Sequence, residues 1–174
     1  TNIGLYMASV LCARDFGLIS SAELYSRLSD TVSSVNSLAK WHGHLYNWYD
    51  TRRGEVLLPY VSTVDSGNFV AALISLRRGI EDYFYEESRL SELIAPLDSL
   101  ISEADFSVLY SESRGLFYTG VNTMTEETDN GFYDFILTKV EVDEILRCLM
   151  LIGAGQTEGF IIEMPSYLMH HTSF

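Results

Sequence analysis

Residues 17–38 read "GLISSAELYSRLSDTVSSVNSL" and predict a helix that directly follows another helix. Gly17 stands where the earlier helix would end, since glycine adopts the left-handed backbone of a helix C-terminus without strain. Ser20 and Glu23 then form an S-x-x-E capping box, which is typical of a helix start. Apolar residues at three- and four-residue spacing predict one buried face. They are Leu24, Leu28, Val32, Val35 and Leu38. We expect Gly43 to end this second helix.

The segment before residue 17 predicts a first helix whose apolar residues lie on almost every side. They are Ile3, Leu5, Tyr6, Val10, Leu11 and Ala13. A helix that is hydrophobic nearly all round is typical of one that is buried on most sides. The two helices therefore predict a helical hairpin with a short connection.

The rest of the chain continues this pattern after a loop over residues 44–63 that contains Gly54 and Pro59. We expect helices over about 64–78 and 81–104, with Pro96 breaking or kinking the latter. Two apolar runs around Ser113 and Gly115 predict a β-hairpin within 106–122, and a last helix follows over about 133–151. The predicted fold is mainly α, an array or toroid of helical hairpins with one short β-hairpin.

The bulk composition narrows the class of protein. The 174 residues, 47% of them hydrophobic, suit one globular domain. A formal charge of −13 disfavours nucleic acid and anionic membranes as partners, because phosphates would be repelled. Cys12 and Cys148 predict reduced, buried thiols in a cytosolic protein. No signal peptide or run of about 20 apolar residues is visible. The start inside a helical pattern suggests an excerpt of a longer protein.

Two polar and aromatic clusters flank the predicted loop: "YNWYD" at 46–50 and "STVDSGN" at 62–68. Burying such polar groups costs free energy unless each has a partner, and large rings left in water are unusual. A surface that stacks on a flat polar ligand and hydrogen-bonds to it explains both. The clusters therefore predict a sugar-binding surface.

Within these clusters Trp48 and Tyr46 are candidates for a stacking platform, although both rings suit a core equally well. Asn47, Thr63 and Asn68 are candidates for hydrogen bonds to sugar hydroxyls. The alternative for these three is local: their side chains bond to the nearby backbone and fix the loop.

Asp65 and Asp50 are the best candidate pair of catalytic carboxyl groups, since most glycosidases use two. For Asp65 the alternative is an N-cap of the following helix. Asp134 is a third candidate, or else the acidic residue that complements the dipole of the last helix. His42 and His44 lack a third ligand of suitable spacing, so we expect no metal and no cofactor. Ser66 in "VDSGN" lacks the G-x-S-x-G pattern of a nucleophile elbow.

Several motifs in order resemble the central, glucoamylase-like domain of the cyclic β-1,2-glucan synthases, which are large bacterial proteins. They are "TNIGLYMASVLCARDFGLIS", "GHLYNWYDT", "YVSTVDSGN", "DFSVLYSESRGLFYTGVN" and "DNGFYD". The resemblance covers residues 1–138. It implies part of an (α/α)6 toroid that acts on β-1,2-glucan by transglycosylation and cyclisation or by hydrolysis, on the cytosolic side of the inner membrane. Asp65 would then lie at the mouth of the toroid, with Asp50 nearby.

The resemblance ends after residue 138, and residues 139–174 predict a last helix and an unmatched tail. Lys139 occupies the place of a glutamate that is a catalytic candidate in the family, while Glu141 and Glu144 lie on different parts of the helix. This departure favours a chain that is inactive alone, and the alternative is a non-catalytic carbohydrate-binding or structural module. The expected partners are a β-glucan oligosaccharide, the rest of a larger polypeptide and a second copy in a homodimer that covers exposed apolar helix faces.

Overall fold

The structure, a computed structural model, describes residues 1–133 of the chain. Within this range lie four α-helices and three short 3-10 helices. The α-helices are α1 (Asn2–Asp15), α2 (Ser21–Ser37), α3 (Thr63–Gly79) and α4 (Ile94–Glu103). The 3-10 helices are η1 (Ile80–Tyr83), η2 (Ser88–Leu93) and η3 (Phe106–Leu109). Several predictions fall outside the described residues. They are those for Asp134, Lys139, Glu141, Glu144, Cys148, the last helix and the tail.

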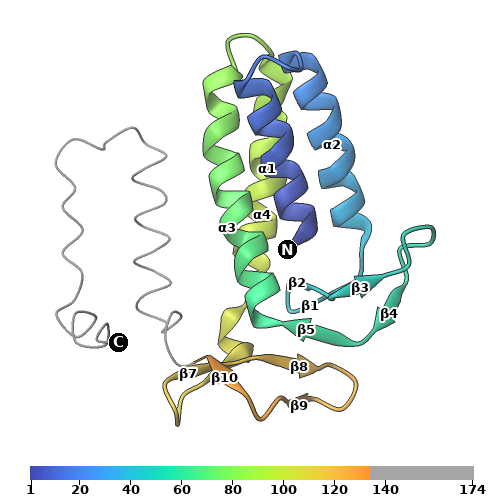
Figure 1. The fold of residues 1–174 in the computed structure, drawn as a ribbon, viewed down its shortest axis with the longest axis vertical. Helices are drawn as coiled ribbons and strands as arrows, with labels where there is room; N and C mark the ends of the chain where they lie inside the picture. The colour runs from blue at the N-terminus through green and yellow to red at the C-terminus, as the bar shows by residue number, and fades with distance from the viewer. Residues whose placement is uncertain (134–174) are drawn as a thin grey trace, which may run out of the picture.

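The four α-helices stand side by side above a base of small antiparallel sheets (Figure 1). α3 packs against α1 and α4, and α1 also packs against α2. The N-terminal end of α1 faces the sheets, as does the start of α3 (Figure 1). A mainly α fold is therefore confirmed. A complete toroid needs more helices than the described range contains, so the toroid stays a prediction.

The sequence predicts the helix starts well. Ser20 caps α2, and its hydroxyl accepts a hydrogen bond from the Glu23 backbone N–H at 3.2 Å, as the capping box requires. The predicted helix over 64–78 is confirmed as α3. Its N-cap is Ser62, whose hydroxyl accepts from the Asp65 N–H at 3.3 Å. The alternative prediction that Asp65 itself is the N-cap is therefore wrong.

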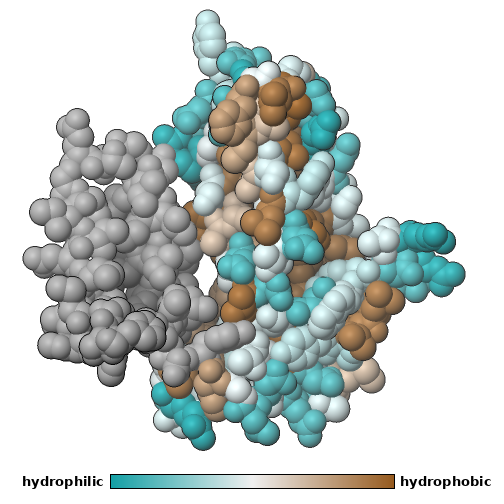
Figure 2. All heavy atoms as spheres, in the orientation of Figure 1, coloured by the Kyte–Doolittle hydropathy of each residue, from teal (hydrophilic) through white to brown (hydrophobic). Residues whose placement is uncertain are grey.

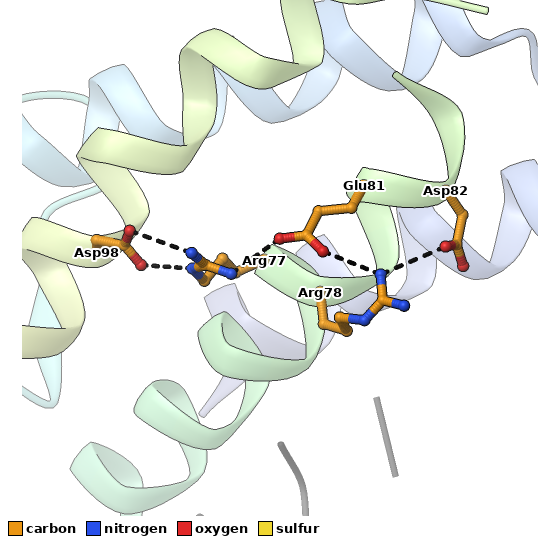
Figure 3. Close-up of polar contacts among 5 residues, drawn as sticks. All are labelled: Arg77, Arg78, Glu81, Asp82 and Asp98. Atoms are coloured by element: carbon orange, nitrogen blue, oxygen red, sulfur yellow. Dashed lines mark hydrogen bonds and ion pairs between the residues drawn. The ribbon is translucent and has the colours of Figure 1, made fainter. Parts of the chain in front are cut away.

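The expected helix over 81–104 is wrong in its first half. Residues 80–93 form η1, a connection and η2, and the α-helix begins only at Ile94. Pro96 does not kink a longer helix, because it lies in the first turn of α4, where the backbone N–H groups have no partner within the helix. An ion-pair network joins this region to α3 (Figure 3): Arg77 contacts both Asp98 and Glu81, and Arg78 contacts Glu81 and Asp82.

The predicted loop over 44–63 contains short strands, and the described residues hold far more β-structure than one hairpin. The ten strands are β1 (Lys40–Trp41), β2 (His44–Leu45), β3 (Trp48–Tyr49), β4 (Val56–Leu58), β5 (Tyr60–Ser62), β6 (Tyr110–Ser111), β7 (Leu116–Tyr118), β8 (Gly120–Asn122), β9 (Glu127–Thr128) and β10 (Phe132–Tyr133). They form sheets ordered β1-β2, β3-β4, β5-β8-β9 and β10-β7-β6. The expected hairpin is confirmed as β6–β7, in which Tyr110 pairs with Phe117.

Gly43 does not end the second helix, which stops at Ser37. It lies in the two-residue turn of the β1–β2 hairpin, where Trp41 pairs with His44. Both turn residues have positive φ, 47° for His42 and 78° for Gly43, which is the geometry of a type I′ hairpin turn. The backbone N–H of Asp105 donates to His42 O at 3.1 Å and so fixes this turn against the end of α4.

Two hydrophobic clusters hold the described residues together. The larger one lies among the helices and includes the fully buried Leu24, Leu28, Leu73, Ile80 and Leu97. The smaller one lies in the sheets and consists of Val61, Leu109, Phe117 and Val121, with Trp41 and Tyr46 packed against it. Because Tyr46 packs against this smaller cluster, the "YNWYD" segment is attached to the sheet core rather than free in solvent.

Two expectations about burial are wrong. α1 buries only one face, through Gly4, Met7 and Val10, while Leu5 and Tyr6 on the same helix are exposed, because its main contacts among the described helices are with α2 and α3. Cys12 is exposed rather than buried. Within residues 1–133, no helix has both the length and the apolar character needed to span a bilayer.

Candidate functional site

A cavity of about 250 Å³ lies where the start of α1, the β2–β3 segment and the first turns of α3 meet. Its lining combines aromatic, apolar and polar side chains. The lining residues include Tyr46, Asn47, Trp48, Tyr49, Asp65, Ser66, Phe69 and Val70, together with Thr1, Ile3, His44 and Ala104. Segments that are far apart in the sequence are thus brought to one place.

α3 presents its cavity residues through its helical repeat. Asp65, Ser66, Phe69 and Val70 are spaced so that they fall on one side of its first two turns. The Ser62 cap fixes where this helix begins and therefore which residues face the cavity. The N-cap role of Ser62 also leaves the Asp65 carboxylate available for other contacts.

The Asp65 carboxylate is held by three groups. The Thr1 hydroxyl donates to Oδ1, the Thr1 amino group lies 3.3 Å from the same oxygen, and Asn47 Nδ2 donates to Oδ2 at 3.2 Å. Burial acts to raise the pKa of Asp65, but the Thr1 hydroxyl and amino group and the Ser62 cap outweigh it, so the pKa lies below its usual value. At neutral pH Asp65 is therefore an acceptor or a base and not a proton donor.

Asn47 connects three elements around the cavity. Its backbone N–H donates to Tyr60 O at 3.0 Å, its Oδ1 accepts from the Ser62 N–H at 3.0 Å, and its Nδ2 reaches Asp65. The local structural alternative for Asn47 is thus supported by these bonds. Asn47 lines the cavity as well, and its predicted hydrogen bond to a sugar hydroxyl stays a prediction.

Trp48 is the most exposed of the aromatic rings at the cavity, with 49% of its surface accessible. Its neighbour Tyr60 has its ring centroid 6.3 Å away at an angle of 36°. Leu58, which pairs with Trp48 across β3–β4, is also exposed, as is Leu57. Apolar atoms reach the surface over β4 at the right of Figure 2. An indole that is half exposed beside a cavity is suited to stacking on a ligand.

Tyr46 and Tyr49 form a more enclosed wall. Their ring centroids are 6.2 Å apart, and Tyr49 Oη accepts from the Tyr46 N–H at 2.9 Å and donates to Ala39 O at 2.7 Å. Burial raises the pKa of the Tyr49 hydroxyl. Because Tyr46 also packs on the sheet core, its ring supports the cavity more than it offers a free stacking face.

Among the described residues, three other predicted site residues do not line this cavity. Thr63 is 1% exposed, and its hydroxyl donates to Tyr118 O at 2.6 Å, which fits the structural alternative. Asn68 is exposed and contacts the Thr1 hydroxyl at 3.5 Å. Asp50 Oδ1 accepts from the backbone N–H groups of Arg52 and Arg53 at 2.8 and 3.0 Å, so its carboxylate stabilises the turn between β3 and β4.

Sequence reasoning did not select His44 or Ser66 as sugar-binding residues, although both line the cavity. His44 is 2% exposed and Ser66 is 5% exposed, while Trp48 and Asp65 are much more accessible. His44 and Ser66 therefore lie at the floor of the cavity, and Trp48 and Asp65 lie at its mouth. The sequence signal that could have located His44 is the turn of its hairpin. That turn reads "HG", which predicts a type I′ turn more weakly than Asn-Gly or Asp-Gly does.

The chemical options of the site follow from this geometry. Asp65 is the one carboxylate among the cavity-lining residues that the structure describes, whereas most glycosidases place two around the bond they cleave. In the same range, no three His, Cys, Asp or Glu side chains are grouped so that they could hold a metal ion. The described part of the cavity offers a half-exposed indole and one carboxylate, which suit the binding of a polar ligand.

Comparison with known proteins supports a relationship over part of the chain. The chain is 48% identical over 77 residues to the cyclic β-(1,2)-glucan synthase NdvB of Rhizobium meliloti (strain 1021). The matched residues make up 44% of this chain and 3% of the relative, so the chain spans only a small part of that protein. No known protein-family model matches the chain.

Proposed function

We propose that the chain is part of a β-1,2-glucan-processing domain and that its cavity forms one glucose-binding position of the substrate cleft. The observation that carries this proposal is the joint placement of Trp48 and Asp65 at the mouth of one cavity. An indole stacks on the apolar face of a sugar ring, and a carboxylate accepts hydrogen bonds from its hydroxyls. The similarity to a cyclic β-(1,2)-glucan synthase supports the choice of glucan.

The surrounding domain belongs to the same proposal. We infer that the four α-helices contribute to an (α/α)6 toroid in a larger polypeptide and that this domain works in the cytoplasm. Transglycosylation with cyclisation, or hydrolysis, would be the activity of the complete domain. It requires a second carboxyl group near Asp65, for which Asp134 remains the candidate outside the described residues.

The second candidate function is carbohydrate binding without cleavage. Two observations favour it for this chain: Asp65 is the one carboxylate that lines the described cavity, and Asp50 is engaged in the β3–β4 turn. Lys139, at the position of the family glutamate, favours the same outcome.

Binding and turnover of linear β-1,2-glucan test the proposal. Calorimetric titration of the 174-residue chain should show binding, and Trp48→Ala should weaken it about tenfold through loss of the stacking face. Tyr85→Ala is the matched control, because Tyr85 is fully exposed and does not line the cavity. The absence of binding by the unmodified chain, or equal losses in both variants, would contradict the proposal.

Product analysis separates the two candidates. Shorter or cyclic glucans formed by the chain would establish catalysis and rule out a purely binding module. Binding without any change in the glucan would favour the second candidate.

A further inference from the structure

Two buried side-chain polar atoms have no hydrogen-bond partner among the described residues: His44 Nδ1 and Ser66 Oγ. Both residues line the cavity described above, and both are more than nine-tenths buried. A buried polar group without a partner destabilises the folded state by about 1–3 kcal/mol. Two such atoms in one cavity therefore indicate that its floor is built to contact a ligand.

The other ring nitrogen of His44 fixes which tautomer is present. Nε2 lies 2.9 Å from Asp105 O, and because a carbonyl oxygen only accepts hydrogen bonds, Nε2 must carry the proton. Burial lowers the pKa of His44 and keeps the ring neutral, although the adjacent Asp105 opposes this effect. Nδ1 is therefore an acceptor with a free lone pair.

The His44 ring is also held in a defined position. His44 pairs with Trp41 in the β1–β2 hairpin. The His44 ring meets the Phe106 ring at an angle of 79°, with the ring centroids 4.9 Å apart. The bond to Asp105 holds the far edge of the ring. An acceptor that is fixed in this way selects for a donor on the ligand.

Ser66 differs from other serine and threonine residues of the helices. Ser9, Thr31, Ser34 and Ser75 each donate to the carbonyl oxygen four residues earlier. That bond is the usual way to satisfy a hydroxyl within a helix. Ser66 lies beside Asp65 on α3, and its hydroxyl lacks such a bond, so it can donate to or accept from a ligand.

We propose that His44 and Ser66 form a hydroxyl-recognition pair at the cavity floor, in which His44 Nδ1 accepts a hydrogen bond from one hydroxyl of a glucose unit and Ser66 bonds to another. This inference rests on the proposed glucan-binding function and assigns the polar contacts that lie beneath the Trp48 stacking face. A neutral acceptor at the floor and the Asp65 carboxylate at the mouth both disfavour anionic ligands. The site therefore selects a neutral polyhydroxy ring and not a phosphorylated or acidic sugar.

Two variants of the full 174-residue chain test the pair with linear β-1,2-glucan oligosaccharides. His44→Gln keeps an amide N–H for Asp105 O and removes the Nδ1 acceptor, and Ser66→Ala removes the hydroxyl. Each should weaken binding about five- to tenfold, the usual effect of one lost hydrogen bond in a buried site. Ser75→Ala is the matched control on α3, because its hydroxyl bonds to Ala71 O.

Unfolding curves and deoxy sugars separate recognition from structural damage. Ser66→Ala should not lower the denaturation midpoint, since it removes an unpaired polar group. A monodeoxy β-1,2-linked disaccharide that lacks the recognised hydroxyl should bind the unmodified chain more weakly, while His44→Gln should not distinguish it from the parent disaccharide.

The outcomes also distinguish the two proposals. If His44→Gln and Ser66→Ala bind glucan as tightly as the unmodified chain while Trp48→Ala does not, the hydroxyl-recognition pair is wrong and the glucan-binding function stands. A structure of the complex in which ordered water alone contacts both atoms would also refute the pair. If the unmodified chain binds no glucan, the proposed function fails, and this inference fails with it.

Discussion

Asp65 shows how one carboxylate acquires a role that depends on its partners. The Thr1 hydroxyl and amino group and the Asn47 amide surround it, although Thr1 is 64 positions away in the sequence. Burial acts to raise the pKa of this carboxyl, but the Thr1 donors and the Ser62 cap stabilise its charged form and bring the pKa below the ordinary value of 3.8. Asp65 can therefore bind a hydroxyl or activate a water molecule, but the general-acid role requires another carboxyl group.

The pKa of Asp65 can be tested through the Thr1 hydroxyl. Thr1→Val removes the hydroxyl that donates to the carboxylate, so the pKa of the Asp65 carboxyl should rise toward its ordinary value, as measured by NMR titration. Glu86 is the control, because Ser21 and Arg14 lower its pKa and Thr1 does not contribute. An unchanged Asp65 titration in Thr1→Val would show that the hydroxyl does not act on it.

The same shift determines how Asp65 affects stability. Because the folded-state pKa is lower than the unfolded-state pKa, the unfolded chain binds more protons in acid. The contribution of Asp65 to stability is therefore complete above the unfolded-state pKa, near 3.8, and is lost as the pH falls through the folded-state pKa.

Among the secondary-structure elements, the β1–β2 hairpin positions part of the cavity floor. It carries His44 on one strand, and its turn is clamped to the end of α4 by the bond from Asp105 N–H to His42 O. A Cβ atom at Gly43 would lie 2.0 Å from Glu103 O, so the backbones approach as closely as only glycine allows. The hairpin thus depends on glycine for its conformation and for its packing.

Two glycine substitutions separate these requirements. Gly17→Ala should cost about 1–2 kcal/mol of unfolding free energy, because its φ is 68° but no atom lies within 4 Å of the added Cβ. Gly43→Ala should cost about 3 kcal/mol or more, since its φ is 78° and the added Cβ meets the Glu103 backbone. Urea denaturation measures both. Equal losses would mean that the contact between the turn and α4 is not tight.

Over the described residues, the hydrophobic cluster among the helices stabilises the fold, while ion pairs and exposed apolar side chains characterise the surface. The helical cluster, with side chains such as Leu73 and Leu97 at 0% exposure, supplies the hydrophobic stabilisation. The Arg77–Asp98 pair of Figure 3 is partly exposed on both sides, so it contributes about 0–1 kcal/mol. The surface of α1 and the turn after it retains Leu5, Tyr6, Phe16 and Leu18 in exposed positions.

These exposed apolar side chains lead us to expect self-association of the isolated chain. Sedimentation velocity should show a dimer, arranged about a two-fold axis, since such patches gain free energy when two copies cover one another. Leu5→Lys combined with Phe16→Lys should shift the chain to monomer. Tyr85→Lys, at another exposed position, should not. A monomer of 19.6 kDa at all concentrations would contradict this prediction.

The helices were predictable where their signals are local. Ser20 with Glu23 and the spacing of Leu24, Leu28 and Val32 involve residues at most four positions apart, and α2 begins where they indicate. α3 was predicted almost to the residue. Local signals failed between residues 80 and 93, where 3-10 turns replace the expected helix. They also failed between residues 40 and 62, where strands pair with segments that periodicity does not reveal.

The amino-acid sequence was sufficient to establish paired helices, an acidic chain and a polar aromatic segment around Trp48 and Asp65, because caps, periodicity and composition act over short distances along the chain. The tertiary arrangement was needed to show that Thr63 and Asp50 are engaged in the fold, that Thr1 reaches Asp65, and that His44 and Ser66 lie together at a cavity floor. The physical reason is that these contacts join residues up to 64 positions apart. Such residues meet only when the shared hydrophobic clusters have brought their elements together.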